Sequence, residues 1–213
     1  VMALRTDDRG CGKSGGDFAT ASYGRLLDDA RAALEALRAR PDVEDVVLVG
    51  HGEGALMAAQ LSAGGALVLL APPGRTLDAI LLEQADDLLR AQGTSDALRP
   101  KILEKERALY DRIRAADGDW LDVEERRTFV GWMKERFRLD PTVLLRDAKA
   151  SRVAILQGSR DEAVPPSHAG LLAQARPGVE VRRFEGLDHV FRRPGAPVDR
   201  EFLKAVVEAV LGR

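Results

Sequence analysis

The sequence predicts an α/β fold with a mostly parallel sheet flanked by helices. Short apolar runs alternate with stretches in which apolar residues recur at helical spacing, and this is the pattern of parallel strands joined by helices. The chain of 213 residues is long enough to bury a core, because folding removes roughly 70% of the unfolded surface from water at about this size. The strand candidates are Val1–Leu4, Val46–Val49, Ala66–Leu70, Val153–Gln157 and Val179–Phe184.

Helices are predicted between and after these strands. A first amphipathic helix lies within TASYGRLLDDARAALEALRAR (residues 20–40) and ends before Pro41, because the residue before a proline disfavours helical geometry. A second helix, Gly54–Leu61, follows the turn after Val46–Val49. The last part of the chain predicts a short helix over SHAGLLAQA (residues 167–175) and a closing helix over PVDREFLKAVVEAVLG (residues 197–212).

The pattern changes between Pro72 and Ala150, where three amphipathic helical stretches follow one another with no strand between them. They are TLDAILLEQADDLLRAQ (residues 76–92), RPKILEKERALYDRIRAA (residues 99–116) and DVEERRTFVGWMKERF (residues 122–137). Helices inserted between two strands in this way indicate a cap over the carboxyl edge of the sheet, where ligand sites of such sheets lie. We therefore expect a core of residues 1–72 and 150–213 and a helical cap of residues 73–149. A purely structural insertion is the alternative.

Four aromatic residues of the insertion are candidates to line a substrate pocket under the cap. The alternative for each of them is packing inside the cap itself, which is the commoner role of an aromatic side chain at helical spacing. The four are Trp120, Phe129, Trp132 and Phe137.

Composition excludes several classes of function. The net charge is −2, so no electrostatic argument favours nucleic acid or an anionic membrane as a partner. The single cysteine excludes an internal disulfide. No apolar run approaches the roughly 18–20 residues that span a bilayer, and we expect no signal peptide. No metal-ligand cluster is visible, so we expect neither a metal nor a cofactor; the compartment is left open, with the cytoplasm slightly favoured.

The stretch VVLVGHGEGALMAA (residues 46–59) combines a strand, a glycine-rich turn and a small-residue helix. Two further loops that follow predicted strands carry Asp161 and His189. The chain order of turn, acid and histidine is the order of a catalytic triad whose nucleophile sits on a sharp strand-to-helix elbow. With these loops, the motifs RTDDRGCGKSGG, LLAPPGRTLDAILLEQ, LDP, LQGSRDEAVPP and GLDHVF resemble the α/β-hydrolase superfamily, above all its bacterial esterase and acyl-peptidase-like serine hydrolases.

The resemblance implies a role for each of these positions. Asp161 matches the acid of the triad, His189 matches the general base, and the backbone N–H of Glu53 matches one oxyanion donor. Position 52 matches the nucleophilic serine of the family, but the residue here is Gly52. Glycine has no atom that can attack a carbonyl. We therefore expect a scaffold for hydrolysis of a small-molecule ester or amide by acyl transfer that is inactive or strongly impaired as written.

Several alternatives remain open for this turn. Gly52 fits either a deliberate inactivating substitution or natural loss, since glycine relieves the strained backbone of an elbow. Cys11 as a replacement nucleophile and a water held by His189 are further alternatives, as is a non-catalytic binding or regulatory protein that uses the cap pocket. His51 is expected to be packed and hydrogen-bonded beneath the elbow, and His168 is expected at the surface.

Two glycine-rich motifs also admit a nucleotide-binding interpretation. GHGEGA (residues 50–55) fits the turn of dinucleotide-binding proteins, which requires an acid about 20 residues further on. The next strand, ALVLLAPPG, contains no acidic residue, and the first one after it is Asp78. GCGKSGG (residues 10–16) resembles a phosphate loop, but Asp7 stands where that loop requires glycine.

The resemblance also implies that the sheet lacks a strand. In the family the third strand lies between the fourth and the fifth, and this chain begins at the strand that matches the fourth. An empty slot would leave backbone groups of the sheet unpaired. We therefore expect either a first strand moved beside Val46–Val49 or a strand supplied by another polypeptide, which would be an N-terminal chain or a swapped homodimer.

Overall fold

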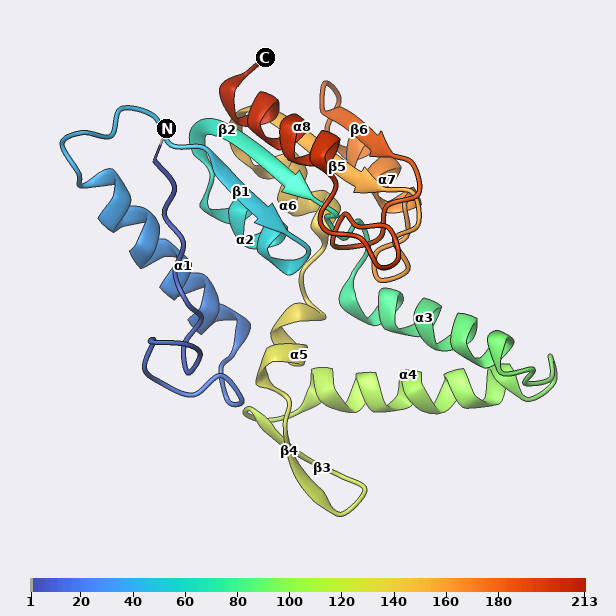
Figure 1. The fold of residues 1–213 in the computed structure, drawn as a ribbon. Coiled ribbons are helices and arrows are strands. Elements are labelled where there is room, and N and C mark those ends of the chain that lie inside the picture. Colours follow the sequence, from blue (N-terminus) through green and yellow to red (C-terminus); the bar gives the residue numbers. More distant parts are fainter. Residues whose placement is uncertain (1) are drawn as a thin grey trace. The chain divides into compact units, whose positions relative to one another are not determined.

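The computed structural model describes residues 2–213, which form two compact units (Figure 1). The helical unit comprises residues 2–40 and Thr76–Leu139, and the sheet unit comprises Pro41–Arg75 and Asp140–Arg213. This grouping places residues 2–40 with the insertion, whereas the sequence predicts them as part of the core. The role of the insertion as a cap over a site stays a prediction.

The sheet unit contains a four-stranded parallel sheet in the order β1-β2-β5-β6. Its strands are β1 (Leu48–His51), β2 (Ala63–Leu70), β5 (Lys149–Gly158) and β6 (Glu180–Phe184). The α/β fold with a parallel sheet is therefore confirmed, and the last four strand candidates are found with shifted ends. The second half of β5 is buried throughout, as expected for a parallel strand covered on both faces.

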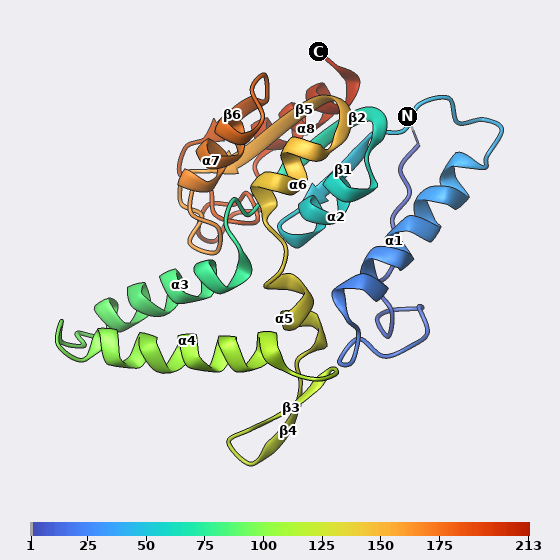
Figure 2. The same ribbon diagram turned by 180° about the vertical axis from the view of Figure 1, so that it is seen from behind.

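Alternating residues of the strands divide the core of the sheet unit into two layers (Figures 1 and 2). Leu67, Leu69 and Ile155 pack with the helices α2 (Glu53–Leu61), α6 (Pro141–Asp147) and α7 (Ser167–Ala175). Val68, Ala154 and Leu156 pack on the opposite face with α8 (Arg200–Leu211). This alternation follows from the two-residue period of a strand.

Helix α6 begins at a capped terminus. The Asp140 carboxylate accepts hydrogen bonds from the backbone N–H of Thr142 at 2.8 Å and of Val143 at 3.4 Å, and Pro141 occupies the first turn. The Thr142 hydroxyl also donates to this carboxylate, and these hydrogen bonds hold the pKa of Asp140 below its ordinary value. The LDP motif of the sequence is thus the start of a helix.

The expectation of a first strand at Val1–Leu4 is wrong for residues 2–4, which lie in no strand; Val1 is outside the described residues. Met2 is 48% exposed and Leu4 is 50% exposed, so this short apolar run has neither a pairing strand nor a buried face. Among the described residues, β1 pairs with β2 alone and forms one edge of the sheet. The sheet is therefore not repaired by the start of the chain.

The helical unit contains α1 (Tyr23–Arg38), α3 (Leu77–Ala91), α4 (Arg99–Ala115) and α5 (Gly131–Arg136). Ser22 caps α1, and the Gly24 N–H donates to the Glu135 carboxylate at 2.6 Å, which ties α1 to α5. The described residues contain no helix that is both long and apolar enough to cross a bilayer.

The expected third helix of the insertion is wrong over its first half, which forms an antiparallel hairpin of β3 (Trp120–Val123) and β4 (Arg126–Phe129). Its two turn residues, Glu124 and Glu125, have φ of 46° and 63°. Two consecutive left-handed residues make the tight turn that matches strand twist, and Asn-Gly or Asp-Gly is its usual sequence. Two glutamates do not indicate such a turn, so the helical spacing of the apolar residues wrongly predicted a helix here.

Candidate active site

The turn between β1 and α2 is a sharp strand-to-helix elbow. Gly52 lies between the two elements with φ 54° and ψ −118°, and its N–H donates to the Leu70 carbonyl at 2.9 Å. A side chain in this backbone region costs on the order of 1–3 kcal/mol. Gly50 is closely packed, because a Cβ added there would lie 2.3 Å from the Gly54 carbonyl oxygen. The elbow therefore depends on glycine at position 50 for space.

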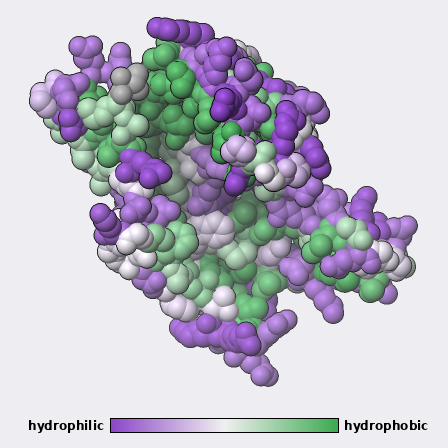
Figure 3. All heavy atoms as spheres, viewed as in Figure 1, coloured by the Kyte–Doolittle hydropathy of each residue, from purple (hydrophilic) through white to green (hydrophobic). Residues whose placement is uncertain are grey.

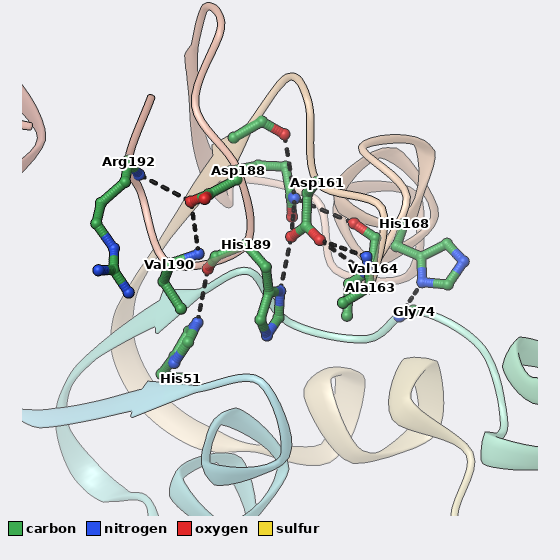
Figure 4. Close-up of polar contacts among 12 residues, drawn as sticks. His51, Gly74, Asp161, Ala163, Val164, His168, Asp188, His189, Val190 and Arg192 are labelled. Carbon is green, nitrogen blue, oxygen red and sulfur yellow. Dashed lines mark hydrogen bonds and ion pairs between the residues drawn. The ribbon is translucent and has the colours of Figure 1, made fainter. Parts of the chain in front are cut away.

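The loops after β5 and β6 bring Asp161 and His189 together (Figure 4). His189 Nδ1 lies 2.9 Å from Asp161 Oδ2, and the Asp161 side chain is fully buried. The other carboxylate oxygen of Asp161 accepts from the N–H groups of Ala163 at 3.0 Å and Val164 at 2.8 Å. A carboxylate can only accept, so Nδ1 carries a proton, and in the neutral imidazole Nε2 of His189 presents a lone pair.

That lone pair faces the elbow. A Cβ built on Gly52 would lie 3.4 Å from His189 Nε2 and 3.7 Å from its Cε1. An oxygen attached to such a Cβ can reach hydrogen-bonding distance of Nε2. The three loops thus bring together positions 52, 161 and 189. A triad role for these positions stays a prediction.

Comparison with protein families matches residues 3–201 to the Alpha/beta hydrolase family. The chain belongs to this family. The α/β-hydrolase match covers both units, and it agrees with the elbow between β1 and α2. Comparison with curated protein sequences gives no match.

Solved structures with the same fold include several hydrolases. One is Est1E from Butyrivibrio proteoclasticus with bound ferulic acid, at 18% identity and TM-score 0.61, covering 97% of this chain and 73% of that one. Another is E-2-(acetamidomethylene)succinate hydrolase, at 18% identity and TM-score 0.58, with 97% and 80% covered. A third is the monoacylglycerol lipase of Paleococcus ferrophilus, at 19% identity and TM-score 0.57, with 94% and 79% covered. At these identities the likeness is one of fold.

Glu53 is the first residue of α2 in this α/β-hydrolase. Its N–H is one of the first-turn groups of the helix, which have no acceptor within the helix itself. Such groups stabilise negative charge that develops nearby. The role of the Glu53 N–H as an oxyanion donor stays a prediction.

The four aromatic candidates lie in the helical unit, whereas the elbow, Asp161 and His189 lie in the sheet unit. Phe137 is 5% exposed and its ring centre lies 5.2 Å from that of Tyr110, within the core of the helical unit. Trp120 and Phe129 pack edge to face across the hairpin, and Trp132 lies on α5. A substrate-lining role for the four stays a prediction.

Two residues beside the pair were not predicted as part of it. Gln157, near the end of β5, donates from Nε2 to Asp161 Oδ2 at 2.9 Å. Its sequence signal is a polar residue that closes the apolar run VAIL. His51 is hydrogen-bonded, as expected, but exposed: its Nε2 lies 2.9 Å from the His189 carbonyl oxygen, and the two rings are 4.6 Å apart (Figure 4).

The expectation of His168 at the surface is wrong, because its side chain is fully buried on α7. Its Nδ1 accepts a hydrogen bond from the Gly74 N–H at 3.2 Å. A Cβ at position 74 would lie 2.6 Å from the His168 carbonyl oxygen, so the chain after β2 packs tightly on the start of α7. A buried imidazole with a backbone donor is a structural feature here.

The remaining candidates are Cys11 and a metal site. Cys11 is exposed and belongs to the helical unit. Within residues 2–213, no group of three or more His, Cys, Asp or Glu side chains is arranged to hold a metal ion.

Proposed function

We propose that this α/β-hydrolase is a scaffold for hydrolysis of small-molecule esters or amides by acyl transfer, and that Gly52 leaves the covalent step absent or strongly impaired. The observation that carries the proposal is the 3.4 Å separation between a Cβ at position 52 and His189 Nε2, with His189 Nδ1 2.9 Å from Asp161. A general base with a fixed tautomer is thereby aimed at the place of a nucleophile.

With a serine at position 52, the chemistry would run in two stages. Nε2 of His189 takes the hydroxyl proton while the oxygen attacks the acyl carbon, and the oxyanion forms near the start of α2. The protonated imidazole then gives its proton to the leaving alcohol or amine, and an acyl-enzyme remains. A water activated by the same Nε2 releases the acid. Glycine supplies no attacking atom, so no acyl-enzyme can form at this position.

The intact pair supports this proposal over a non-catalytic binding protein. A binding protein needs no buried acid 2.9 Å from a histidine whose other nitrogen faces the elbow. Such a pair persists at a cost, since a buried carboxylate must have its hydrogen bonds satisfied. A binding role for the protein as written remains the alternative that the following experiment separates.

The test is labelling with a fluorophosphonate, read by intact mass, on the unchanged chain and on Gly52→Ser. We expect the adduct on Gly52→Ser alone, because the reagent needs an activated hydroxyl. Gly52→Ala is the matched control, since it introduces the same Cβ at φ 54° without the hydroxyl.

A second control is Gly52→Ser with His189→Gln, which should lose the label because the hydroxyl has no base. Labelling of the unchanged chain, with Cys11 or another residue carrying the adduct, would contradict the assignment of position 52. No labelling of either protein would favour the binding role.

We also propose that the open edge of β1 pairs with a strand of another polypeptide, either an N-terminal chain or a swapped second copy. Val49 on β1 is 47% exposed, and Leu203 and Val207 on α8 are exposed as well. Apolar side chains gather in the upper part of the face shown in Figure 3. An edge strand with exposed valine invites such pairing.

Light scattering after size exclusion tests the second copy. We expect a dimer that Val49→Lys dissociates, because a charge on an edge strand blocks pairing. Val181→Lys is the matched control, since Val181 is a 41% exposed valine on β6, at the other edge. A monomer at all concentrations excludes the swapped dimer, and dissociation by Val181→Lys instead would place the interface at β6.

A further inference from the structure

We propose that Gln157 is a positioning residue for the Asp161–His189 pair. Its amide donates to the same carboxylate oxygen of Asp161 that receives His189 Nδ1. This inference rests on the proposed function of the pair, but the contacts that carry it belong to Gln157 itself.

The amide of Gln157 has one orientation that satisfies its surroundings. The side chain is 1% exposed, and its Nε2 lies 2.9 Å from Asp161 Oδ2, 3.3 Å from the Val164 carbonyl and 3.4 Å from the Gly158 carbonyl. All three neighbours are acceptors. An amide turned by 180° would place its own oxygen against them, so the NH₂ group must face Asp161.

Both oxygens of Asp161 are thereby held from two sides. One accepts the backbone N–H groups of Ala163 and Val164, and the other accepts Gln157 and His189. The backbone donors fix the first oxygen, and the Gln157 donor fixes the second at the place where His189 Nδ1 meets it. Without Gln157, the only side chain among the described residues bonded to the second oxygen of Asp161 would be His189, the residue that this oxygen orients.

Stability alone does not account for this amide. Gln157 Oε1 is buried and has no hydrogen-bond partner among residues 2–213. An unpaired buried acceptor destabilises a folded protein, whereas a methionine of similar length after the apolar run VAIL would avoid that cost. The contribution of the residue therefore lies in its donor, and the shortest contact of that donor is with Asp161.

Two substitutions separate positioning from packing. Gln157→Met keeps the length and removes the donor. In a Gly52→Ser background we expect about a 10- to 100-fold lower kcat with KM little changed. The reason is that displacing a catalytic group by about 1 Å lowers the rate by up to about 100-fold. In the unchanged Gly52 chain, the low-field NMR signal of the His189 Nδ1 proton should broaden or disappear, since its acceptor is no longer fixed.

Gln157→Glu keeps the shape and makes the donor depend on pH. A protonated carboxyl can donate to Asp161 as the amide does, whereas two carboxylates at this distance repel each other. We expect the His189 signal to persist at low pH and to be lost as pH rises. In the Gly52→Ser background, activity should fall on the alkaline side as well, in addition to the acid-side loss that protonation of the general base His189 causes in every variant. This alkaline loss should be absent from proteins that retain Gln157.

Ser62→Ala is the matched control, because Ser62 is a buried polar residue of the same unit whose hydroxyl donates to the Ala59 carbonyl at 2.7 Å. It should change the melting temperature and leave the His189 signal intact. Assignment of that signal uses His189→Gln. The NMR experiment needs no catalysis, so an inactive Gly52→Ser with a Gln157-dependent signal would refute the hydrolase proposal and keep the positioning role.

The positioning role is overturned if Gln157→Met lowers the melting temperature but leaves the His189 signal and kcat unchanged. If Gln157→Met does not fold, the isosteric Gln157→Glu decides. The inference is also overturned if the His189 signal of Gln157→Glu has the same pH dependence as the signal of the protein that retains Gln157.

Discussion

Asn in place of Asp161 is expected to slow ester hydrolysis by Gly52→Ser about 10⁴-fold, which is the size of effect found when the acid of a serine triad becomes an amide. The residual activity should come from substrate binding and oxyanion stabilisation. The protein should still fold, because Asp161→Asn preserves the volume of a fully buried side chain.

The reason is the orientation that the loop imposes on an amide at this position. The N–H groups of Ala163 and Val164 donate to one oxygen of Asp161, so the carbonyl oxygen of an asparagine must take that place. Its NH₂ group then faces His189 Nδ1 and the donor of Gln157. The imidazole would have to accept at Nδ1 and carry its proton on Nε2, where it could not act as a base.

The measurement is kcat/KM for an activated ester, compared between Gly52→Ser and Gly52→Ser with Asp161→Asn. Asp188→Asn is the control, because that carboxylate accepts N–H bonds from Val190 and Arg192 beside His189 without meeting its Nδ1 (Figure 4). A loss below about 10-fold for Asp161→Asn would mean that Asp161 does not set the tautomer of His189.

Much of the candidate site followed from the sequence because the fold is a parallel sheet. The carboxyl ends of parallel strands meet at one edge, so residues in the loops after Val46–Val49, Val153–Gln157 and Val179–Phe184 were expected to lie close together. The short distance between Asp161 and His189 agrees with that expectation. Hydrophobic patterning predicted these strands, and the resemblance to the α/β-hydrolase superfamily singled out Asp161 and His189 in the loops after them.

The parts that the sequence did not predict depend on contacts that periodicity does not report. The hairpin Trp120–Phe129 depends on left-handed backbone at two glutamates, and the burial of His168 depends on how closely the chain at Gly74 approaches it. Gln157 looked like the polar end of a strand, and its donor role appears only when the loop folds back over it. The exposed Met2 and Leu4 show that an apolar run needs a partner to become a strand.

Gly50→Ala is expected to destabilise the sheet unit by more than about 3 kcal/mol, which places it among the largest effects of a single substitution. A Cβ at this position would lie 2.3 Å from the Gly54 carbonyl oxygen and 2.6 Å from Ala55 Cα. Both neighbours are backbone atoms of α2, so no change of side-chain rotamer can relieve the overlap. The start of α2 would have to move away from β1.

Gly54→Ala is the matched control, because a Cβ at Gly54 meets no atom within 4 Å. It should be neutral or stabilise α2 by up to about 1 kcal/mol, since alanine favours a helix over glycine. Both tryptophans, Trp120 and Trp132, lie in the helical unit, so their fluorescence would follow the wrong part of the molecule. Hydrogen exchange of the β1 and β2 amides reports on the sheet unit directly.

The comparison of these two alanines also bears on the function. The close approach at Gly50 sets where α2 begins, and therefore where position 52 lies relative to His189. If Gly50→Ala proves as stable as Gly54→Ala, the elbow can accommodate a Cβ at position 50, contrary to the close contacts of the structure. The 3.4 Å separation between a Cβ at position 52 and His189 Nε2 then loses its support. If Gly50→Ala unfolds the sheet unit while Gly54→Ala does not, the tight turn is a rigid frame. A serine introduced at position 52 is then held close to Nε2 of His189. The difference in reactivity between Gly52→Ser and the unchanged chain measures the effect of the missing hydroxyl.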